Sequence, residues 1–273
     1  MTPREPSCID LNADVGELPE RLADGREAAL IRPLSSANVA CGGHAGDGDS
    51  MRAVIALCRE AGVAVGAHPS YPDRVHFGRR PVAMSRTALV DSLRQQIQDL
   101  AQVARSQGVS LSHIKPHGAL YHAAADDLQA ASALVDVVRS LDQPLPLFAR
   151  AGSRGLFVFR EAGLVVYEEA FADRRYVSSC ALVERGQPGA ILGSLDEVTE
   201  QALGLIQRRS VQAADGQRVE FAQPIATLCL HSDTPGAERL AAGLRAALFA
   251  AGITVCRPGA GARPEPAHSS AAR

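Results

Sequence analysis

The densest group of ionisable side chains lies between His113 and His122, where ten residues include three histidines, one lysine and one tyrosine. Lys115 stands between an apolar residue and Pro116, so we expect it to be buried and to hold a carboxylate, a phosphate or a developing oxyanion. The alternative is that Lys115 forms a buried ion pair and has only a structural role. His117 follows two residues later and is predicted to point to the same side of an extended backbone. His113, in phase with both, is expected deeper in the fold, and His122 in a solvent-facing loop.

Carboxylates and histidines also follow other predicted strands. These groups are Asp14 and Glu17, His44 and Asp47, His68, Glu169 and Asp173, and His231 and Asp233. The first pair suits a metal ligand and a general base, with turn or helix-capping carboxylates as the alternative. His44 lies in a Gly-rich turn and suits a ligand, a general base or an oxyanion partner. A surface-loop histidine is the alternative for both His44 and His68.

Two further sets of residues suggest binding chemistry. Asp14, His44 and His68 suit a metal with imidazole and carboxylate ligands, although no H-x-x-x-H spacing supports that hypothesis. Arg79 and Arg80 suit a clamp on a carboxylate or a phosphate, with a solvated loop pair as the alternative. The sequence contains neither a G-x-S-x-G elbow nor a Walker A loop, so it does not locate a nucleotide site.

A regular series of elements must position these groups. Strands are predicted at residues 8–12, 34–40, 63–67, 109–111 with the segment that follows, 145–149, 164–168 and 225–230, with a possible short one at 253–256. Helices are predicted at 50–61, 85–107, 126–141 and 153–162, after the capping box at 194–197, and from Thr234-Pro235 to Gly252; residues 20–31 are expected to be a loop and a short helix.

This alternation of strands and helices predicts parallel strands joined by crossover helices. A doubly wound open sheet and a β/α barrel both fit the order. An open sheet gathers its ligand groups at one crevice, whereas a barrel gathers the carboxyl ends of all its strands in a ring. Six chemically equipped strand ends therefore favour a parallel β/α barrel of seven or eight strands. We expect one barrel domain over residues 1–257 and a disordered tail over 258–273, which is rich in Pro, Gly, Ala and Ser.

Composition excludes several classes of protein. The net charge is −2 and no long basic run occurs, which argues against a nucleic-acid partner. No apolar run is long enough to cross a membrane and the N-terminus has no apolar signal segment, so a cytoplasmic location without membrane attachment is expected. The six cysteines are scattered without a C-x-x-C pair, which argues against a structural zinc site and predicts no disulfide framework.

Taken in order, the motifs resemble those of one family. They are Asp10-Leu-Asn-Ala-Asp-Val-Gly-Glu17, Ser36-Ala-Asn-Val-Ala-Cys-Gly-Gly-His-Ala-Gly-Asp47, Gly66-Ala-His-Pro69, Phe77-Gly-Arg-Arg80, His113-Ile-Lys-Pro-His-Gly-Ala-Leu-Tyr121, Glu169-Ala-Phe-Ala-Asp-Arg174 and His231-Ser-Asp-Thr-Pro-Gly236. The set resembles the LamB/YcsF family, which supplies the A subunit of bacterial 5-oxoprolinase, over about residues 8 to 256. Departures from the family pattern at Ala13, Leu18–Asp24, Gly43 and Val177–Cys180 concern the shape of the pocket.

The resemblance implies a β/α barrel of the glycoside hydrolase/deacetylase type. It also implies hydrolysis of 5-oxoproline to L-glutamate, coupled to hydrolysis of ATP with Mg²⁺, together with subunits B and C. A metal-dependent amide hydrolase or deacetylase using Asp14, His44 and His68 is one alternative, and a substrate-binding subunit without turnover is the other. The expected catalytic residues are Asp14, Glu17, His44, His68, Lys115, His117 and His231, and the expected substrate-binding residues are Arg79, Arg80, Asn38, Glu169 and Asp233.

Three roles are expected of these residues in 5-oxoproline hydrolysis. Lys115, with Arg79 or Arg80, stabilises phosphate and oxyanion charge. A carboxylate, Asp14 or Glu17, activates water together with His44 or His68. The leaving nitrogen takes its proton from His117 or His231.

Overall fold

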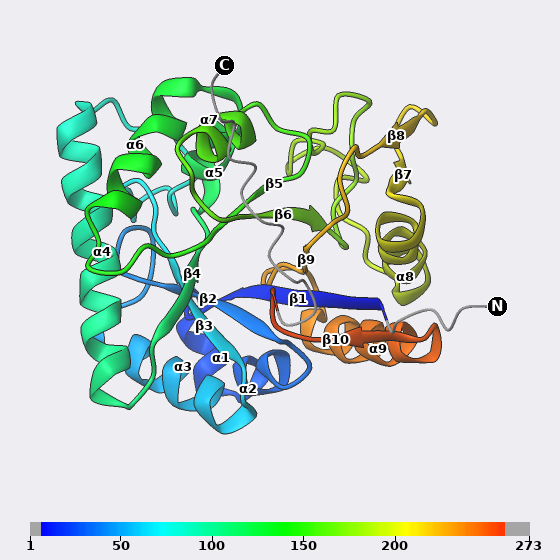
Figure 1. Cartoon of the computed structure of the whole chain (residues 1–273). Helices are drawn as coiled ribbons and strands as arrows, with labels where there is room; N and C mark the ends of the chain where they lie inside the picture. The colour runs from blue at the N-terminus through cyan, green and yellow to red at the C-terminus, as the bar shows by residue number, and fades with distance from the viewer. Residues whose placement is uncertain (1–6, 260–273) are drawn as a thin grey trace, which may run out of the picture.

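The computed structural model of the chain describes residues 7–259. Its first strand, β1 (Ser7–Val15), pairs in parallel with β10 (Ile253–Val255) at its start, β9 (Thr227–Cys229) in its middle and β2 (Ser36–Ala40) at its end. The β1–β9 pairing closes a ring in the order β1-β2-β3-β4-β5-β6-β9, and β10 extends the sheet beside β1 without joining the ring (Figure 1). The predicted parallel barrel is therefore confirmed, with seven strands.

Helices surround the ring and follow most of its strands. The other barrel strands are β3 (Ala64–His68), β4 (Leu111–Ile114), β5 (Leu147–Arg150) and β6 (Val166–Phe171). The helices are α1 (Pro19–Ala23), α2 (Arg26–Ile31), α3 (Gly48–Ala61), α4 (Arg86–Ser106), α5 (Gly118–Asp126), α6 (Leu128–Arg139), α7 (Gly155–Glu161), α8 (Leu195–Leu203) and α9 (Ala237–Ala250). No helix among residues 7–259 is long and apolar enough to cross a membrane.

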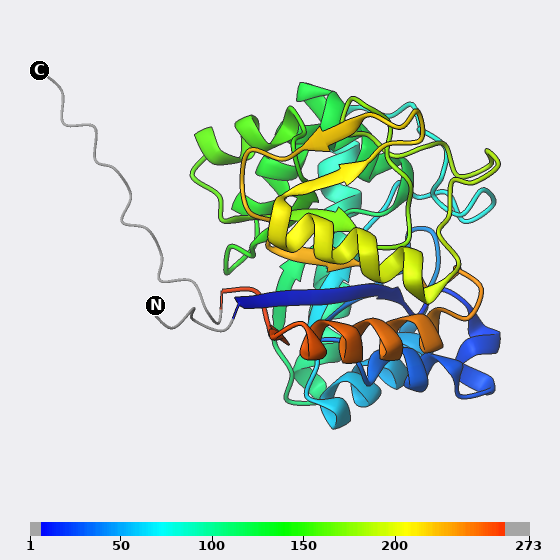
Figure 2. The ribbon, with the colours of Figure 1, turned by 90° about the vertical axis from the view of Figure 1, so that its right-hand side faces the viewer.

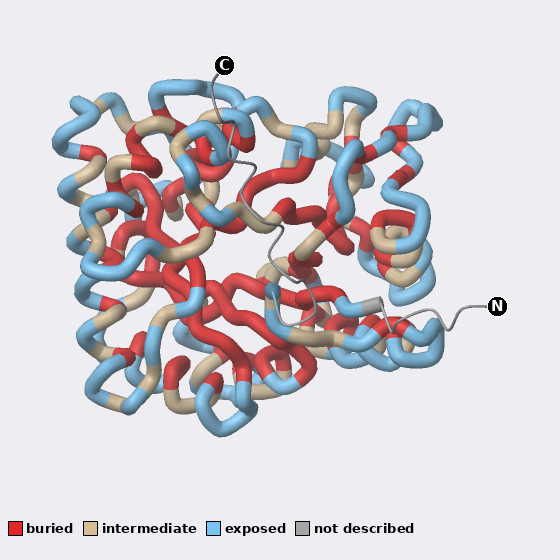
Figure 3. Tube along the Cα trace, in the orientation of Figure 1, coloured by how far each residue is buried: buried red, intermediate tan, exposed pale blue. Residues whose placement is uncertain are grey.

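The barrel interior is polar, while its outer face is apolar. Along β1, Asp10, Asn12 and Asp14 alternate with Ile9 and Leu11, and all five are buried. Since successive strand residues point to opposite faces, the polar series lies on the inner face and the apolar series under the helices. Figure 3 shows the barrel strands buried and the outer turns of the helices exposed. The barrel therefore encloses a hydrogen-bonding interior that can carry a site.

Local signals placed the long helices correctly. The side chain of Asp47 accepts hydrogen bonds from the backbone of Asp49 and Ser50 at the start of α3, and Ser50 completes a capping box. At the start of α4, the Ser85 hydroxyl accepts from the Ala88 amide. Caps of this kind satisfy amides that lack a partner within the helix, which fixes where each helix begins.

Two helix boundaries differ from the prediction. The segment after His117 is not a loop, because α5 begins at Gly118 and α6 begins only after Asp127, whose side chain caps it. The last helix begins at Ala237 rather than at Pro235. Thr234, the expected helix start, instead donates its hydroxyl to the Asp173 carboxylate. In both places a tertiary contact or an alanine-rich helix outweighs the nearby sequence signal.

The segment between β6 and β9 carries elements that the sequence pattern missed. A π-helical turn, η1 (Gly204–Arg208), follows α8 and leads into a hairpin of β7 (Ser210–Gln212) and β8 (Arg218–Glu220). Figure 2 shows α8 and this hairpin on one side of the barrel, above β1 and α9. Each of these two strands has a single apolar residue, Val211 or Val219, between two polar ones, which is too little to give a recognisable strand pattern.

The expectation of no disulfide was wrong for one pair of cysteines. Cys8 on β1 and Cys256, directly after β10, form a disulfide between Cα atoms 6.0 Å apart. Pairing of β1 with β10 brings these positions together, which sequence spacing does not reveal. Cys41, Cys58 and Cys229 are free and buried, as expected. Of the predicted disordered tail, residues 260–273 lie outside the described residues.

Candidate active site

Lys115 lies at the centre of the carboxyl end of the barrel. Its Nζ lies 2.9 Å from Asp14 Oδ1, 3.1 Å from Glu169 Oε1, 2.9 Å from Cys229 Sγ and 3.3 Å from Asn12 Oδ1. Burial opposes the lysine charge, but Asp14, Cys229 and Glu169 raise the pKa of Lys115 well above its ordinary value. The residue is therefore a permanent buried cation held by three strands. Both roles expected of Lys115 are compatible with this geometry, because it forms ion pairs and also lines a cavity.

Beneath Lys115, a hydrogen-bonded layer fixes the carboxylates that pair with it. Asn12 Nδ2 donates to Glu169 Oε1 at 2.9 Å and to Thr227 Oγ1 at 2.7 Å. Asn38 Nδ2 donates to Asn12 Oδ1 at 2.8 Å and to Asp14 Oδ1 at 2.9 Å. Because these amides occupy the carboxylate lone pairs, Asp14 and Glu169 remain oriented toward the lysine.

His113 completes this layer, in the deep position predicted for it. Its Nε2 lies 2.7 Å from Asn38 Oδ1, its ring stacks on Phe148, and Gly66 leaves the space that it fills. A Cβ at Gly66 would lie 2.1 Å from His113 Nε2, so only glycine fits opposite the imidazole. Burial and the nearby Lys115 lower the pKa of His113 to about 3.

We therefore expect stability to fall as the pH drops below about 6.5. The unfolded state binds a proton at His113 from pH 6.5 downward, whereas the folded state binds one only near pH 3. The contribution of His113 is nearly complete at about pH 7.5, and about 2 kcal/mol of it is lost by about pH 5. The His113→Gln variant should lack this loss. Urea unfolding of both proteins at the two pH values measures the difference, and an equal change in both would contradict the prediction.

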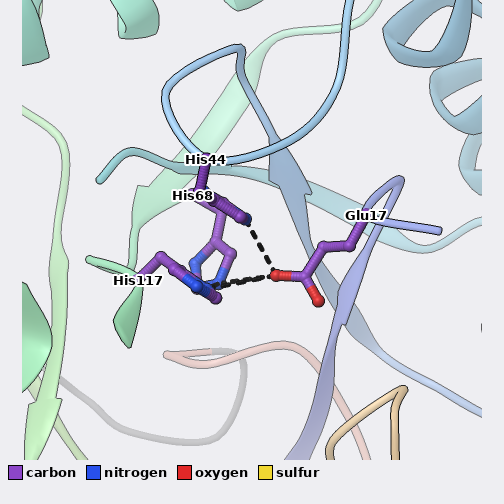
Figure 4. Close-up of side chains that lie close together, drawn as sticks. All are labelled: Glu17, His44, His68 and His117. Carbon is purple, nitrogen blue, oxygen red and sulfur yellow. Dashed lines mark hydrogen bonds and ion pairs between the residues drawn. The ribbon is translucent and has the colours of Figure 1, made fainter. Parts of the chain in front are cut away.

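A second group of side chains surrounds one oxygen of Glu17. Glu17 Oε1 lies 2.9 Å from His44 Nε2, 3.1 Å from His117 Nδ1 and 3.6 Å from His68 Nε2. Figure 4 shows the three imidazoles converging on this carboxylate, with His44 and His117 stacked face to face. All four residues are buried, and one donor atom from each lies within 4.8 Å of the others. We call this group the Glu17 quartet.

His231 belongs to a separate group. Its Nδ1 lies 2.9 Å from Asp173 Oδ1, and its backbone amide donates to Asp173 Oδ2. Burial would raise the pKa of Asp173, but His231 and Thr234 hold it below the usual value. A ring nitrogen of His231, an oxygen of Asp14 and the sulfur of Cys229 lie within 4.8 Å of one another. With Nδ1 fixed by Asp173, His231 has a second nitrogen available for proton transfer.

Both groups border a cavity of about 390 Å³ at the carboxyl end of the barrel. Among the predicted site residues, those that line it are Asp14, Glu17, His68, Arg79, Lys115, His117, His231 and Asp233. His44 stands behind His117, while Asn38 and Glu169 lie in the layer beneath Lys115. Arg80 is exposed and does not line the cavity. His122 is exposed as predicted, but it lies on α5 at the cavity edge rather than in a loop.

On the rim of the cavity, three arginines outnumber the carboxylates of Glu184 and Asp233. Arg79 and Arg185 both pair with Asp233, at 2.7 Å and 2.5 Å, so two guanidinium groups share one carboxylate. Arg174 is buried beside them; its Nη2 donates to the Val183 carbonyl oxygen at 2.6 Å, and its Nε has no partner among residues 7–259. The surplus of guanidinium groups favours an anionic ligand, because Arg presents several N–H donors to a carboxylate or phosphate.

Sequence reasoning missed several members of the site. Asn12 and Cys229 carried no role, although Asn12 is in phase with Asp14 on the inner face of β1. Asp173 was noted at a strand end without a function. Arg185 gave no signal, because it lies in an irregular segment that only the fold brings to the cavity.

Gly43 has a structural explanation. A Cβ at this position would lie 2.4 Å from both Gln96 Oε1 and Ser70 Oγ. Gln96 accepts from the Ser70 amide at 3.0 Å and donates to its carbonyl oxygen at 2.9 Å, which holds the loop after His68. In this chain Gln96 therefore occupies the space beside residue 43.

The chain is similar to several known proteins. Residues 9–262 match the model of the LamB/YcsF family. The 5-oxoprolinase A subunit of Methylococcus capsulatus is 45% identical over 251 residues, which cover 92% of this chain and 96% of that protein. The corresponding A subunit of Bordetella pertussis is 42% identical over 248 residues, covering 91% and 98%. The crystal structure of the lactam utilization protein from Thermus thermophilus has a TM-score of 0.83 at 38% identity, covering 91% of this chain and 98% of that one.

Proposed function

Because this chain belongs to the LamB/YcsF family, we propose that it hydrolyses 5-oxo-L-proline to L-glutamate as the A subunit of an ATP-dependent 5-oxoprolinase, together with subunits B and C. The observation that carries the proposal is the cavity with Lys115 on its floor and an arginine-rich rim. Its shape and charge fit a small lactam that bears one carboxylate. ATP, with Mg²⁺, provides the driving force, since a lactam amide resists attack by water.

In the proposed complex, the rim of the cavity contacts the substrate carboxylate and the floor contacts the lactam. Arg79 and Arg185 share Asp233, and their net positive charge supports binding of the substrate carboxylate. The lactam oxygen then points toward Lys115. The cavity volume of about 390 Å³ leaves room for a phosphoryl group beside the lactam ring.

In the proposed reaction, the lactam oxygen attacks the γ-phosphorus of ATP, which releases ADP and leaves a phosphorylated imidate. One water molecule adds to the activated carbon, and the carbon–nitrogen bond then breaks as the nitrogen takes a proton. The resulting acyl phosphate reacts with a second water to give glutamate and phosphate. Lys115 stabilises the negative charge on the phosphoryl and carbonyl oxygens.

The hydrogen bonds favour His231 over His117 as the proton donor to the leaving nitrogen. His117 uses Nδ1 toward Glu17 and His68, and its Nε2 lies 2.9 Å from the Phe77 carbonyl oxygen. In contrast, Asp173 fixes only one nitrogen of His231. Asp14 lies within 4.8 Å of His231, so one substrate atom or water can contact both side chains. Asp14 is the proposed base for water, because Asn38 and Lys115 bond its Oδ1 and not its Oδ2, whereas Glu17 is surrounded by imidazoles.

Reconstitution tests this proposal. Glutamate release from 5-oxoproline is measured with the chain alone, with subunits B and C, and with each mixture in the presence or absence of ATP. We expect release only from the complete set with ATP. Release by the chain alone without ATP would contradict the proposal and support the metal-dependent amide hydrolase.

A further inference from the structure

We propose that the Glu17 quartet binds one divalent first-row transition-metal ion at the wall of the cavity. Its ligands are Glu17 Oε1, His68 Nε2 and His117 Nδ1, from three barrel strand ends and the segments that follow them. The fourth member, His44, stacks parallel to His117 with ring centroids 3.6 Å apart, so one ion cannot lie in both ring planes, and His44 Nε2 instead lies 2.9 Å from Glu17 Oε1, as its hydrogen-bond donor. This inference does not depend on the proposed substrate, because it rests on the hydrogen-bonding roles of the four side chains.

The first argument comes from the tautomer of His68. Its Nδ1 lies 2.7 Å from the backbone oxygen of Lys115. A carbonyl oxygen only accepts hydrogen bonds, so Nδ1 must carry a proton and donate it. In a neutral imidazole the other nitrogen, Nε2, then bears a lone pair, and this nitrogen lies 3.0 Å from His117 Nδ1, 3.4 Å from Asp14 Oδ2 and 3.6 Å from Glu17 Oε1.

His117 has the opposite tautomer to His68. Its Nε2 lies 2.9 Å from the backbone oxygen of Phe77, so Nε2 carries the proton and Nδ1 bears the lone pair. Phe77 has a φ of 55°, a left-handed conformation that is costly for a non-glycine residue, and this conformation is part of the turn that places its carbonyl. Bonds from ring N–H groups to backbone oxygens are the arrangement that orients histidine ligands around metals.

The two lone pairs therefore face one another. His68 Nε2 and His117 Nδ1 are 3.0 Å apart, and the acceptor oxygen of Glu17 lies 3.6 Å and 3.1 Å from them. Three acceptors this close repel unless a cation lies between them. The cation is either a metal ion or a single proton that converts His68 to imidazolium.

The spacing and the donor types favour the metal. Ligands about 2.0–2.1 Å from a tetrahedral ion lie about 3.3 Å apart, and the three separations among Glu17 Oε1, His68 Nε2 and His117 Nδ1 run from 3.0 to 3.6 Å. Two imidazoles and one carboxylate suit zinc and its first-row neighbours, whereas Mg²⁺ and Ca²⁺ prefer oxygen ligands. Because Glu17, His68 and His117 line the cavity, the ion can be reached from it.

Metal analysis of the untagged full chain, purified without chelators, tests the site. The chain is stripped with a chelator and titrated with Zn²⁺ and Co²⁺ by calorimetry, with Mg²⁺ as a comparison ion. We expect one equivalent of Zn²⁺ or Co²⁺ with micromolar or tighter affinity, a visible absorption spectrum for Co²⁺ with nitrogen ligands, and no uptake of Mg²⁺. No substrate or partner subunit is present, so the result is separate from any failure of the proposed function.

Matched variants locate the ion. His117→Gln and Glu17→Gln should each reduce the bound metal at least tenfold, whereas His122→Gln, which lies five residues beyond His117 but outside the quartet, should retain one equivalent. Circular dichroism verifies that each variant is folded. Absence of binding by the folded wild-type chain, or an unchanged metal content in both quartet variants, would overturn the proposal and favour the shared proton.

Discussion

Replacement of Lys115 with methionine is expected to reduce ATP-dependent glutamate release by the reconstituted complex at least about 10²–10³-fold. The same change should lower the free energy of unfolding by about 3–5 kcal/mol, because it leaves Asp14 and Glu169 buried without their cation. Methionine preserves much of the side-chain volume, so the loss is one of charge. Steady-state assays and urea unfolding measure the two effects separately.

A second substitution separates catalysis from stability at this position. In the double variant Lys115→Met/Glu169→Gln, one uncompensated carboxylate is removed along with the lysine. We expect the double variant to regain part of the lost stability and none of the activity. Normal turnover by a folded Lys115→Met complex would contradict the catalytic role and leave Lys115 as a structural ion pair. That outcome would also revive the alternative of a substrate-binding subunit without turnover.

Replacement of His231 with alanine is the second change with a large expected effect. If His231 gives its proton to the leaving nitrogen, kcat should fall about 10²–10⁴-fold. Stability should fall by about 1–3 kcal/mol, because the buried Asp173 loses the ring N–H and Phe171 loses a stacking partner, while the His231 amide and Thr234 still donate to Asp173. Asp173→Asn should reduce kcat in the same direction, because an amide no longer fixes the ring as the carboxylate does.

His122→Gln is the control for these substitutions. His122 also lines the cavity, but it is exposed and has no hydrogen bond to Asp173. We expect its kcat to remain near that of the wild-type complex. If His231→Ala retains full activity while His117→Ala does not, the proton donor is His117 and the assignment based on free ring nitrogens is wrong.

Much of the barrel could be predicted because its signals are local. The apolar stripe of α4 and its start at Ser85 depend on residues only a few positions apart, and the structure places this helix close to the predicted bounds. Polar residues at six strand ends also favoured a ring, since parallel strands bring their carboxyl ends together. The strands of the β7–β8 hairpin were too short to leave a comparable pattern.

The different surroundings of Asp14 and Glu17 could not be predicted from local patterns. From the sequence, Asp14 and Glu17 are two carboxylates on one turn with interchangeable roles. In the structure, Asp14 pairs with Lys115, whereas Glu17 lies among His44, His68 and His117. β1 ends at Val15, between the two residues. Asp14 therefore belongs to the strand, whereas Glu17 lies in the segment that follows it.

The sequence by itself determined the fold class, the family motifs and most of the ionisable groups that meet at the carboxyl end of the barrel. The tertiary structure alone decided that the ring closes with seven strands, that Arg185 reaches the cavity, and that Cys8 pairs with Cys256. The physical reason is the separation along the chain of the residues that interact. Periodicity and capping act over a few residues, whereas closure, charge pairing and tautomers depend on contacts between strands that lie far apart in the chain.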